Sequence, residues 1–364
     1  MFENIKKRYK YDDFYFLKQQ LSFSKKNPTR LKDIKILHNA PLFENTLFKI
    51  EALLEMGAHL VVSSPFGPGD ETAIQELTKL KIPIIRNQDF NQYGPYDLIL
   101  DTAALCLNKT EAKIGTVELT QTGANKYRQA KLSSPVISVD DSQLKIIEDF
   151  YGTGDGYVRA IKKYCDNSIS SFRFLLFGYG KVGAGIYHYL KKEKLHCTVV
   201  EKCPDRLAEL QKQKIPHIKC SQLKALKEHL LKSTDIVVTA TGSKNILSKM
   251  QLNKEDFSKV KYLTNMGADD EYGKLFNASE VLFNKLPLNF ALKEPTLAAY
   301  IDPPMYAHNL SAELLLYDAR FKKIGFYPFP EELDQAIVKK WSELQNINFK
   351  AALPSLAPDN SRKN

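Results

Sequence analysis

Short apolar runs rich in β-branched residues alternate along the chain with stretches of helical periodicity. One series of runs occupies residues 34–139, with helical patterns such as 47–56 and 71–80 between them, and a second series occupies residues 172–267. Alternation of this kind is typical of α/β domains built on largely parallel sheets. The pattern therefore predicts an α/β fold with two such domains in tandem. The expected strands are IKIL 34–37, HLVV 59–62, IPIIR 82–86, DLIL 97–100, PVISV 135–139, FRFLLF 172–177, CTVVE 197–201, DIVVTATG 235–242 and VKYLTNMG 260–267.

A long amphipathic stretch, residues 140–167, separates the two series and predicts one helix interrupted at Gly152–Gly156. We place the domain boundary near residue 150, with one α/β domain over residues 1–150 and the second over residues 151–304. Helical patterns return after the second series. We expect this C-terminal segment, about residues 305–364, to pack back on the first domain and complete it.

Composition excludes several classes of protein. No apolar run in the 364 residues approaches the roughly 18 that a membrane-spanning helix needs, and the N-terminus lacks the apolar core of a signal peptide. We therefore expect a cytoplasmic protein with no membrane partner. The five cysteines show no C-x-x-C spacing, which argues against a disulfide scaffold or a zinc site. The formal charge of +10 is interleaved with acids, so we expect no nucleic-acid partner.

A glycine-rich turn follows the run at 172–177 and precedes a helical pattern. Its glycines, Gly178, Gly180 and Gly183, have the G-x-G-x-x-G spacing that permits a tight turn, close approach to a pyrophosphate, and close packing of helix on strand. The next run ends at Glu201, where a carboxylate can accept hydrogen bonds from a ribose 2′-hydroxyl. An acid there disfavours a 2′-phosphate, so the pattern predicts NAD rather than NADP. The alternative is a structural turn followed by an incidental glutamate.

The order of motifs from about residue 35 to residue 341 resembles the S-adenosylhomocysteine hydrolase family. The matching segments are LTQTGANKY 119–127, PVISVDDSQLK 135–145, YG 151–152, GYGKVGAG 178–185, TATG 239–242, NMG 265–267 and LDQAIVKKW 333–341. The resemblance implies an N-terminal substrate domain, a Rossmann domain that binds NAD, and a C-terminal return. It further implies a homo-oligomer, a dimer or tetramer, acting on a small molecule of one-carbon metabolism.

In that family, tightly bound NAD oxidises a substrate hydroxyl, a thiol is eliminated, water adds, and the resulting ketone is reduced again. The resemblance implies cofactor contacts beyond the three glycines and Glu201. These are Thr120, Gln121, Thr122, Lys181, Val182, Thr239, Thr241, Gly242 and Asn265. Taken alone, Thr and Gly at a strand end are equally ordinary turn residues.

The family's K-x-x-x-D matches Lys145 and Asp149, four residues apart and so on one face of the expected connecting helix. A lysine beside a carboxylate can hold and deprotonate an alcohol as hydride leaves, so the resemblance makes this pair the catalytic candidate. The alternative is a solvated ion pair, although lysine before aspartate is the less favourable order for helix stabilisation.

Other positions depart from the family. The family's first-domain histidine aligns with Pro41, and its adenine-contacting residues align with Phe43 and Asn45. The second Asp of I-L-D-D-G-G-D becomes Thr102, the Glu before T-T-T becomes Leu119, and two further histidines become Ala268 and Asp302. Glu118 lies one position off, which in a strand points its side chain to the opposite face. The C-terminal Lys and Tyr that close a neighbouring subunit's NAD site become Ala357 and Ser361.

These departures favour a hydrolase-like enzyme that still oxidises a hydroxyl with tightly bound NAD, on a non-standard nucleoside or thioether substrate. An ordinary dehydrogenase that releases NADH and a non-catalytic NAD-binding sensor or partner protein are the alternatives. For His38 and His308 a core or surface role outweighs catalysis. The acids at 269–271 could bind a cation, but consecutive acids in a loop are usually solvated, so we expect no metal.

Overall fold

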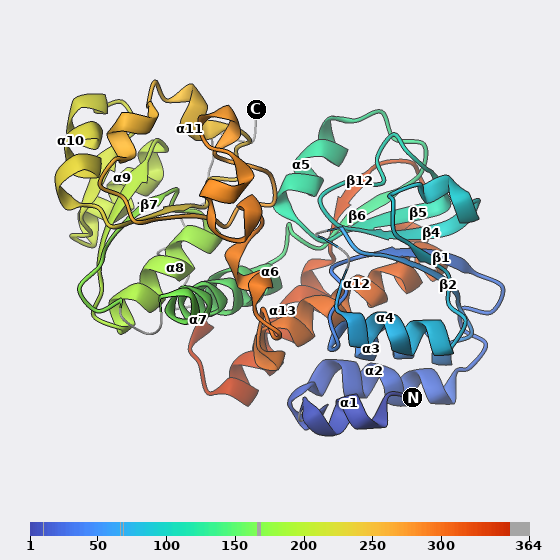
Figure 1. Cartoon of the computed structure of the whole chain (residues 1–364). Coiled ribbons are helices and arrows are strands. Elements are labelled where there is room, and N and C mark those ends of the chain that lie inside the picture. The colour runs from blue at the N-terminus through green and yellow to red at the C-terminus, as the bar shows by residue number, and fades with distance from the viewer. Residues whose placement is uncertain (10, 66, 68, 166–168, 350–364) are drawn as a thin grey trace. The chain divides into compact units, whose positions relative to one another are not determined.

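The computed structural model describes residues 1–9, 11–65, 67, 69–165 and 169–349. These form two compact units (Figure 1). The first comprises Met1–Ile147 and Ala298–Gln345, and the second comprises Glu148–Leu297 with the described residues from Asn346 onward. Each unit is an α/β structure built on one parallel sheet. The fold class expected from the alternating pattern is therefore confirmed.

Seven parallel strands make the sheet of the first unit, in the order β12-β6-β5-β4-β1-β2-β3. The order reverses between β1 and β4, which is the topological switch point where open α/β sheets bind ligands. The sequence pattern missed β5, because Lys113 and Gly115 break its apolar run, and it missed the short edge strand β12. The strands are β1 (Lys35–Asn39), β2 (His59–Ser63), β3 (Ile84–Ile85), β4 (Tyr96–Asp101), β5 (Ala112–Glu118), β6 (Val136–Ser138) and β12 (Phe326–Pro328).

Helices of the first unit come from both ends of the chain. The helix expected at 309–317 is longer and begins at Ala298, although it contains Pro303 and Pro304. Pro303 has no N–H to donate to the carbonyl of Ala299, and the Trp341 indole N–H donates to that carbonyl instead, at 2.6 Å. The helices are α1 (Glu3–Arg8), α2 (Tyr15–Lys26), α3 (Thr46–Glu55), α4 (Glu71–Lys79), α5 (Gln121–Gln129), α6 (Leu144–Ile146), α12 (Ala298–Tyr317) and α13 (Glu331–Gln345).

The sheet of the second unit has five parallel strands in the order β11-β10-β7-β8-β9. Read from the other edge, this is the 3-2-1-4-5 order of a Rossmann domain, with its switch point between β7 and β10. The short edge strand β9 was not expected. The elements are β7 (Arg173–Phe177), β8 (His196–Glu201), β9 (His217–Lys219), β10 (Ile236–Thr239), β11 (Tyr262–Asn265), α7 (Gly154–Tyr164), α8 (Lys181–Lys192), α9 (Pro204–Lys212), α10 (Leu223–Ser233) and α11 (Ile246–Lys249).

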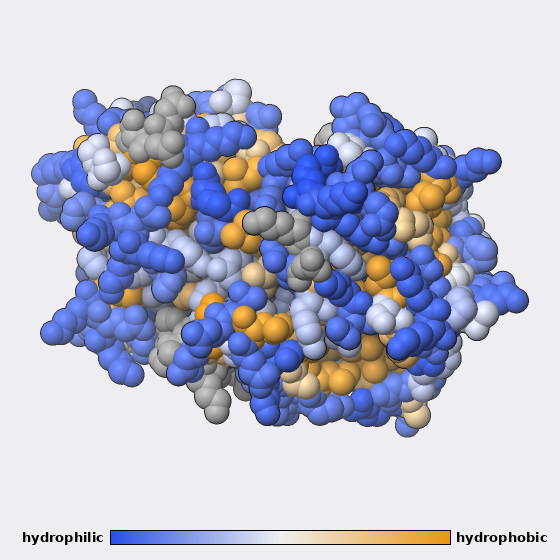
Figure 2. Space-filling model, turned by 90° about the horizontal axis from the view of Figure 1, so that it is seen from below, coloured by the Kyte–Doolittle hydropathy of each residue, from blue (hydrophilic) through white to orange (hydrophobic). Residues whose placement is uncertain are grey.

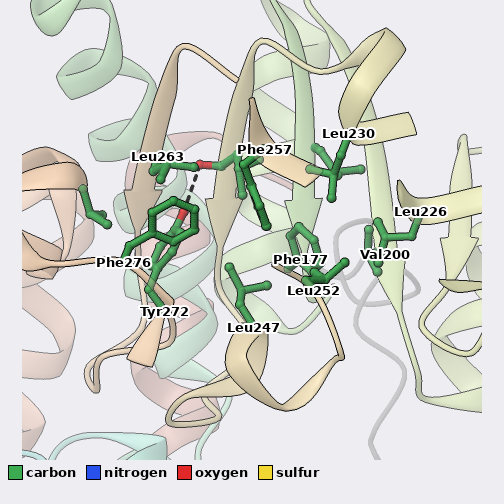
Figure 3. Packing of buried hydrophobic residues seen from close by; sticks show 13 residues of the cluster. Phe177, Val200, Leu226, Leu230, Leu247, Leu252, Phe257, Leu263, Tyr272 and Phe276 are labelled. Carbon is green, nitrogen blue, oxygen red and sulfur yellow. Dashed lines mark hydrogen bonds between the residues drawn. The ribbon is translucent and has the colours of Figure 1, made fainter. Parts of the chain in front are cut away.

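The core of the second unit packs strand side chains against α10 and the segments after β11 (Figure 3). Phe177, Val200 and Leu263 come from three strands, and Leu226 and Leu230 come from α10; all five are buried. Tyr272 is fully buried beside them, and its hydroxyl bonds the carbonyl of Val237 at 3.4 Å and that of Thr264 at 3.1 Å. Burial of this apolar surface is the main favourable contribution to folding of the unit.

Hydrophilic residues cover most of the surface seen in Figure 2, with smaller apolar patches between them. This agrees with a chain in which 26% of residues are charged. Within the described ranges, the structure contains no helix that is both long and apolar enough to cross a bilayer.

The connecting segment differs from the single interrupted helix expected at 140–167. A short helix, α6, leads into a π-helix at Ile147–Thr153, and α7 follows directly. Glycines let α7 and α8 touch backbone to backbone. A Cβ on Gly154 would lie 2.5 Å from the carbonyl carbon of Gly185, and a Cβ on Gly185 would lie 2.1 Å from the carbonyl oxygen of Phe150. No side chain fits at either crossing position.

We expect Gly185→Ala to lower the free energy of unfolding by about 2–4 kcal/mol, because the new methyl group meets backbone that cannot move aside. Urea denaturation followed by circular dichroism measures this. Lys191→Ala, on the exposed side of the same helix, is the matched control and should change stability by less than about 0.5 kcal/mol. Equal stabilities for Gly185→Ala and the wild type would contradict the close helix crossing.

Candidate functional site

The glycine turn lies at the carboxyl end of β7, at the switch point of the second sheet. Gly178 has φ +96°, and a Cβ there would lie 2.6 Å from the Ala240 carbonyl oxygen. A Cβ on Gly183 would lie 2.1 Å from the carbonyl oxygen of Gly178. Only glycine fits these two positions. Gly180 is the N-cap of α8 and has no side chain to cap it, so the first amides of the helix are available to an anion.

Glu201 ends β8 with its carboxylate held by backbone amides. Its Oε2 accepts from Tyr179 N at 2.7 Å, and its Oε1 accepts from the amides of Lys202 at 2.7 Å and Cys203 at 2.9 Å. The side chain is therefore oriented before any cofactor binds. It lies beside the glycine turn, where the acidic residue of a Rossmann domain receives the ribose hydroxyls.

Arg206, in the first turn of α9, is a site residue that the sequence reasoning missed. Its guanidinium lies 3.8 Å from Glu201 Oε2 and 3.7 Å from the position of a Cβ on Gly180. It therefore joins the ribose-binding carboxylate to the pyrophosphate turn. The available signal was an arginine close after the acidic strand end, which in other Rossmann domains accommodates a 2′-phosphate. Here Glu201 offsets that positive charge.

Asp149 and Lys181 form an ion pair within the second unit, with Oδ2 and Nζ 3.3 Å apart. Lys181 is the first residue of α8, so the pair lies at the helix end that faces a bound pyrophosphate. Asp149 belongs to the π-helix, and the expectation that residues 145 and 149 share one face of an α-helix is therefore corrected. Lys145 belongs to the first unit and is 2% exposed. The catalytic role of both residues stays a prediction.

The expected cofactor residues after β10 and β11 form a buried hydrogen-bond network. Thr239 Oγ1 donates to Asn265 Oδ1 at 3.0 Å, and Asn265 Nδ2 donates to the carbonyls of Gly267 and Lys285 at 3.0 and 2.6 Å. Both side chains are fully buried, so they shape the strand ends. Gly242 is exposed with φ +66°, and its turn is the part of this region open to a ligand.

Glu271 corrects the expectation that the acids at 269–271 are solvated. It is fully buried, and its carboxylate accepts from the amides of Thr241 at 3.0 Å and Gly242 at 2.6 Å. Burial raises the pKa of Glu271 to about 7. Asp270 pairs with Lys285 at 2.9 Å. Within the described ranges, no group of three His, Cys, Asp or Glu side chains could hold a metal ion.

In the first unit, carboxylates and amides meet at the carboxyl ends of β4 and β5. Glu118 is fully buried and accepts from the amides of Ala103 and Ala104, both at 3.0 Å, and from the Thr120 hydroxyl at 2.7 Å. Asp101, its partner in the strand register, accepts from Asn39 and Tyr127 at 2.7 and 2.6 Å. Glu118 therefore faces the same polar cluster as Asp101.

Thr120 is the N-cap of α5, and its Oγ1 accepts from Gly123 N at 3.2 Å. Its hydroxyl thus has structural partners, whereas Gln121 is exposed and Thr122 half-buried. Asp302, at the position of a family histidine, accepts from the amides of Phe16 and Leu17 at 2.7 and 2.8 Å. It therefore caps α2. Ala357 and Ser361 lie outside the described residues.

Comparison with known proteins agrees with the geometry of the second unit. Residues 174–281 match the TrkA-N domain family. A 152-residue stretch is 30% identical to an adenosylhomocysteinase of Acinetobacter baylyi, covering 38% of this chain and 32% of the relative. The chain thus spans about a third of that relative's length. The second unit is a Rossmann domain, and its cofactor is NAD.

Solved structures with similar folds include a dipicolinate synthase of Bacillus halodurans and a transhydrogenase of Sinorhizobium meliloti. The first is 13% identical, with a TM-score of 0.44 over 78% of this chain and 98% of that chain. The second is 13% identical, with a TM-score of 0.39 over 77% of this chain and 93% of that chain.

Two glycine variants separate folding from cofactor binding. We expect Gly183→Ala to destabilise the protein by more than about 2 kcal/mol, because its methyl group would overlap the Gly178 carbonyl. Gly180→Ala meets only the Arg206 guanidinium, at ordinary contact distance, so it should fold normally. Its methyl group would hinder a pyrophosphate and weaken NAD binding about tenfold or more, or ~1.4 kcal/mol. Thermal unfolding and calorimetric NAD titration measure the two effects, and unchanged NAD affinity in Gly180→Ala would refute the pyrophosphate position.

Glu118 should make stability depend on pH. Burial and the neighbouring Asp101 raise the pKa of Glu118 from 4.5 to about 8 in the folded protein. Between these values the folded state holds a proton that the unfolded state has lost, so its contribution is present at low pH and is lost as pH rises. We expect Glu118→Gln to remove on the order of 2 kcal/mol of this decline across that range. Urea denaturation at both ends of the range tests it, and parallel pH profiles would contradict the assignment.

Proposed function

We propose that the protein is an NAD-dependent enzyme that oxidises a hydroxyl of a small substrate while NAD stays bound, by chemistry similar to that of the S-adenosylhomocysteine hydrolases. The observation on which this rests is the prepared cofactor site, where the glycine turn, the free amides of α8 and the oriented Glu201 carboxylate lie together. NAD would supply the hydride acceptor. The chain's own residues bind and orient it.

Glu201 and Lys181 would divide the binding of the cofactor between them. Glu201, held by three amides, would accept the ribose hydroxyls, and Arg206 beside it would lie along the ribose and pyrophosphate. Lys181 would lie at the phosphates, with Asp149 fixing its ammonium. Lys145 would take the proton from the substrate hydroxyl, since a buried lysine readily gives up its charge.

The second step of the reaction differs from that of the family in this proposal. Asp302 occupies the position of a proton-transferring histidine and is engaged by two amides of α2. Pro41 and Phe43 offer no proton-transfer group at the positions of a histidine and an adenine contact. Support for a non-standard substrate therefore comes from both positions. An ordinary dehydrogenase that exchanges NADH is the second candidate, favoured by the replacement of the family's closing Lys and Tyr by Ala357 and Ser361.

Mass spectrometry of the small molecules released from freshly purified protein comes first, because a retained substrate would identify itself. With that substrate, we expect Lys145→Ala to lose reduction of bound NAD, read as absorbance of NADH, by at least about a hundredfold, while NAD affinity stays within about twofold. Full NAD reduction in this variant would contradict the role of Lys145. Turnover of S-adenosylhomocysteine at the family's rates would contradict the non-standard substrate.

Glu201→Ala provides the complementary test of the cofactor site. We expect NAD affinity to fall by about tenfold or more, because the ribose hydroxyls lose their acceptor. NADP affinity should fall less, because Arg206 then faces the 2′-phosphate without a competing carboxylate. Calorimetric titration with both cofactors measures the ratio, and an unchanged ratio would remove the ribose assignment.

A further inference from the structure

Three fully enclosed basic side chains meet in the first unit, away from the residues discussed above. Lys49, from α3, places its Nζ 2.7 Å from Nε2 of His38, which lies in β1, and the two residues are 1% and 0% exposed. His308, from α12, is also 0% exposed, and its Nε2 lies 3.2 Å from the carbonyl oxygen of Val117. The Nδ1 atoms of both histidines have no hydrogen-bond partner among the described residues.

The carboxylates of neighbouring elements are engaged elsewhere. Glu51, on α3, pairs with the N-terminal amine and Lys6 at 2.8 and 2.9 Å. Asp302 accepts two amides of α2, and Glu313, also on α12, pairs with Arg30 at 2.8 Å. Asp101 and Glu118 belong to the polar cluster of Asn39. Since Asn39 follows His38 in β1, that cluster lies on the opposite face of the sheet.

A buried ammonium without an anion is costly, by several kcal/mol, so such a group either loses its proton or acquires a negative partner. Burial lowers the pKa of Lys49 and, together with the charge of Lys49, lowers that of His38. The pKa of His308 is lowered by burial and by the charges of Lys49, His38 and Lys145. The empty cluster is therefore largely uncharged at neutral pH, and an entering anion would restore its protons.

The position of the cluster suits a ligand. His38 is the penultimate residue of β1, and β1 and β4 flank the switch point of the first sheet. Ligands of open α/β sheets bind outside the carboxyl ends of the strands at this point. We propose that Lys49, His38 and His308 bind the carboxylate group of a small substrate. This rests on the proposed function in one respect, that the ligand is the molecule whose hydroxyl is oxidised.

A carboxylate fits this cluster better than a phosphate. An uncharged cluster balances one negative charge by taking up one proton, whereas a phosphate dianion requires two. Phosphate sites are also typically built from arginine and from backbone amides at helix N-termini. The hydrogen bonds described for the three side chains come instead from an amine and two imidazoles.

Calorimetry on the full chain with lactate as probe tests the proposal, because lactate has both a carboxylate and a neighbouring hydroxyl. Propane-1,2-diol is the neutral analogue of the same shape. We expect saturable lactate binding, uptake of about one proton when two buffers of different ionisation enthalpy are compared, and up to about tenfold weaker affinity per pH unit as pH rises. The diol should not bind. Failure of lactate, succinate and benzoate to bind at millimolar concentrations would overturn the proposal, as would tighter binding of inorganic phosphate than of all three.

Lys49→Met keeps the length of the side chain and removes its charge. We expect this variant to lose lactate binding and proton uptake while its melting temperature stays equal or rises, because no acid depends on the amine. Lys113→Met, at an exposed position of β5, is the matched control and should bind lactate normally. His308→Gln keeps a donor for the Val117 carbonyl and should reduce proton uptake, which provides a second test if Lys49→Met does not fold. Normal lactate binding in both cluster variants would refute the site.

The two proposals fail in different ways. Proton-linked lactate binding that depends on Lys49, in a protein that reduces no NAD with the substrate recovered from it, would retain the carboxylate site and reject the proposed oxidation. NAD reduction by a neutral alcohol that is unaffected by Lys49→Met would do the reverse. NAD affinity should be equal in Lys49→Met and the wild type, since Lys49 belongs to the first unit and the glycine turn to the second.

Discussion

Backbone amides at the carboxyl edge of a parallel sheet need acceptors, and buried carboxylates supply them in both units. Glu118 binds the amides of Ala103 and Ala104 in the first unit, where both alanines have positive φ. Glu201 and Glu271 bind turn amides at the edge of the second sheet. Each carboxylate exchanges a large desolvation cost for several charge-assisted hydrogen bonds. These bonds fix the turns on which the cofactor site is built.

The same edge explains why the cofactor site is prepared before NAD arrives. The glycines remove side chains where the turn passes β10, and Glu201 holds the turn through the amide of Tyr179. Arg206 and Lys181 then add positive charge beside the amides of α8, each partly offset by a carboxylate. A pyrophosphate would meet donors already in place, so little ordering free energy is spent when it binds.

The first unit separates acids and bases across its sheet. Asn39 and His38 are neighbours in β1 and point to opposite faces, so the acid cluster of Asp101 and Glu118 lies on one face and the basic cluster of Lys49 and His308 on the other. Each cluster is buried among like charges, which shifts the pKa of its members toward the neutral form. This is an arrangement in which binding of an opposite charge has a large effect.

The sequence by itself determined the α/β class, the parallel strands with long apolar runs, and the glycine turn with Glu201, because periodicity and turn chemistry are local properties. It did not determine the short edge strands β9 and β12, the π-helix, or the N-terminal half of α12, where the Trp341 indole replaces a missing proline N–H. Only the tertiary structure decided that Arg206 reaches Gly180, that Glu271 is buried, and that Lys49 meets His38 and His308. These contacts join residues from different elements, and spacing along the chain has no information about which distant side chains a fold brings within hydrogen-bond reach.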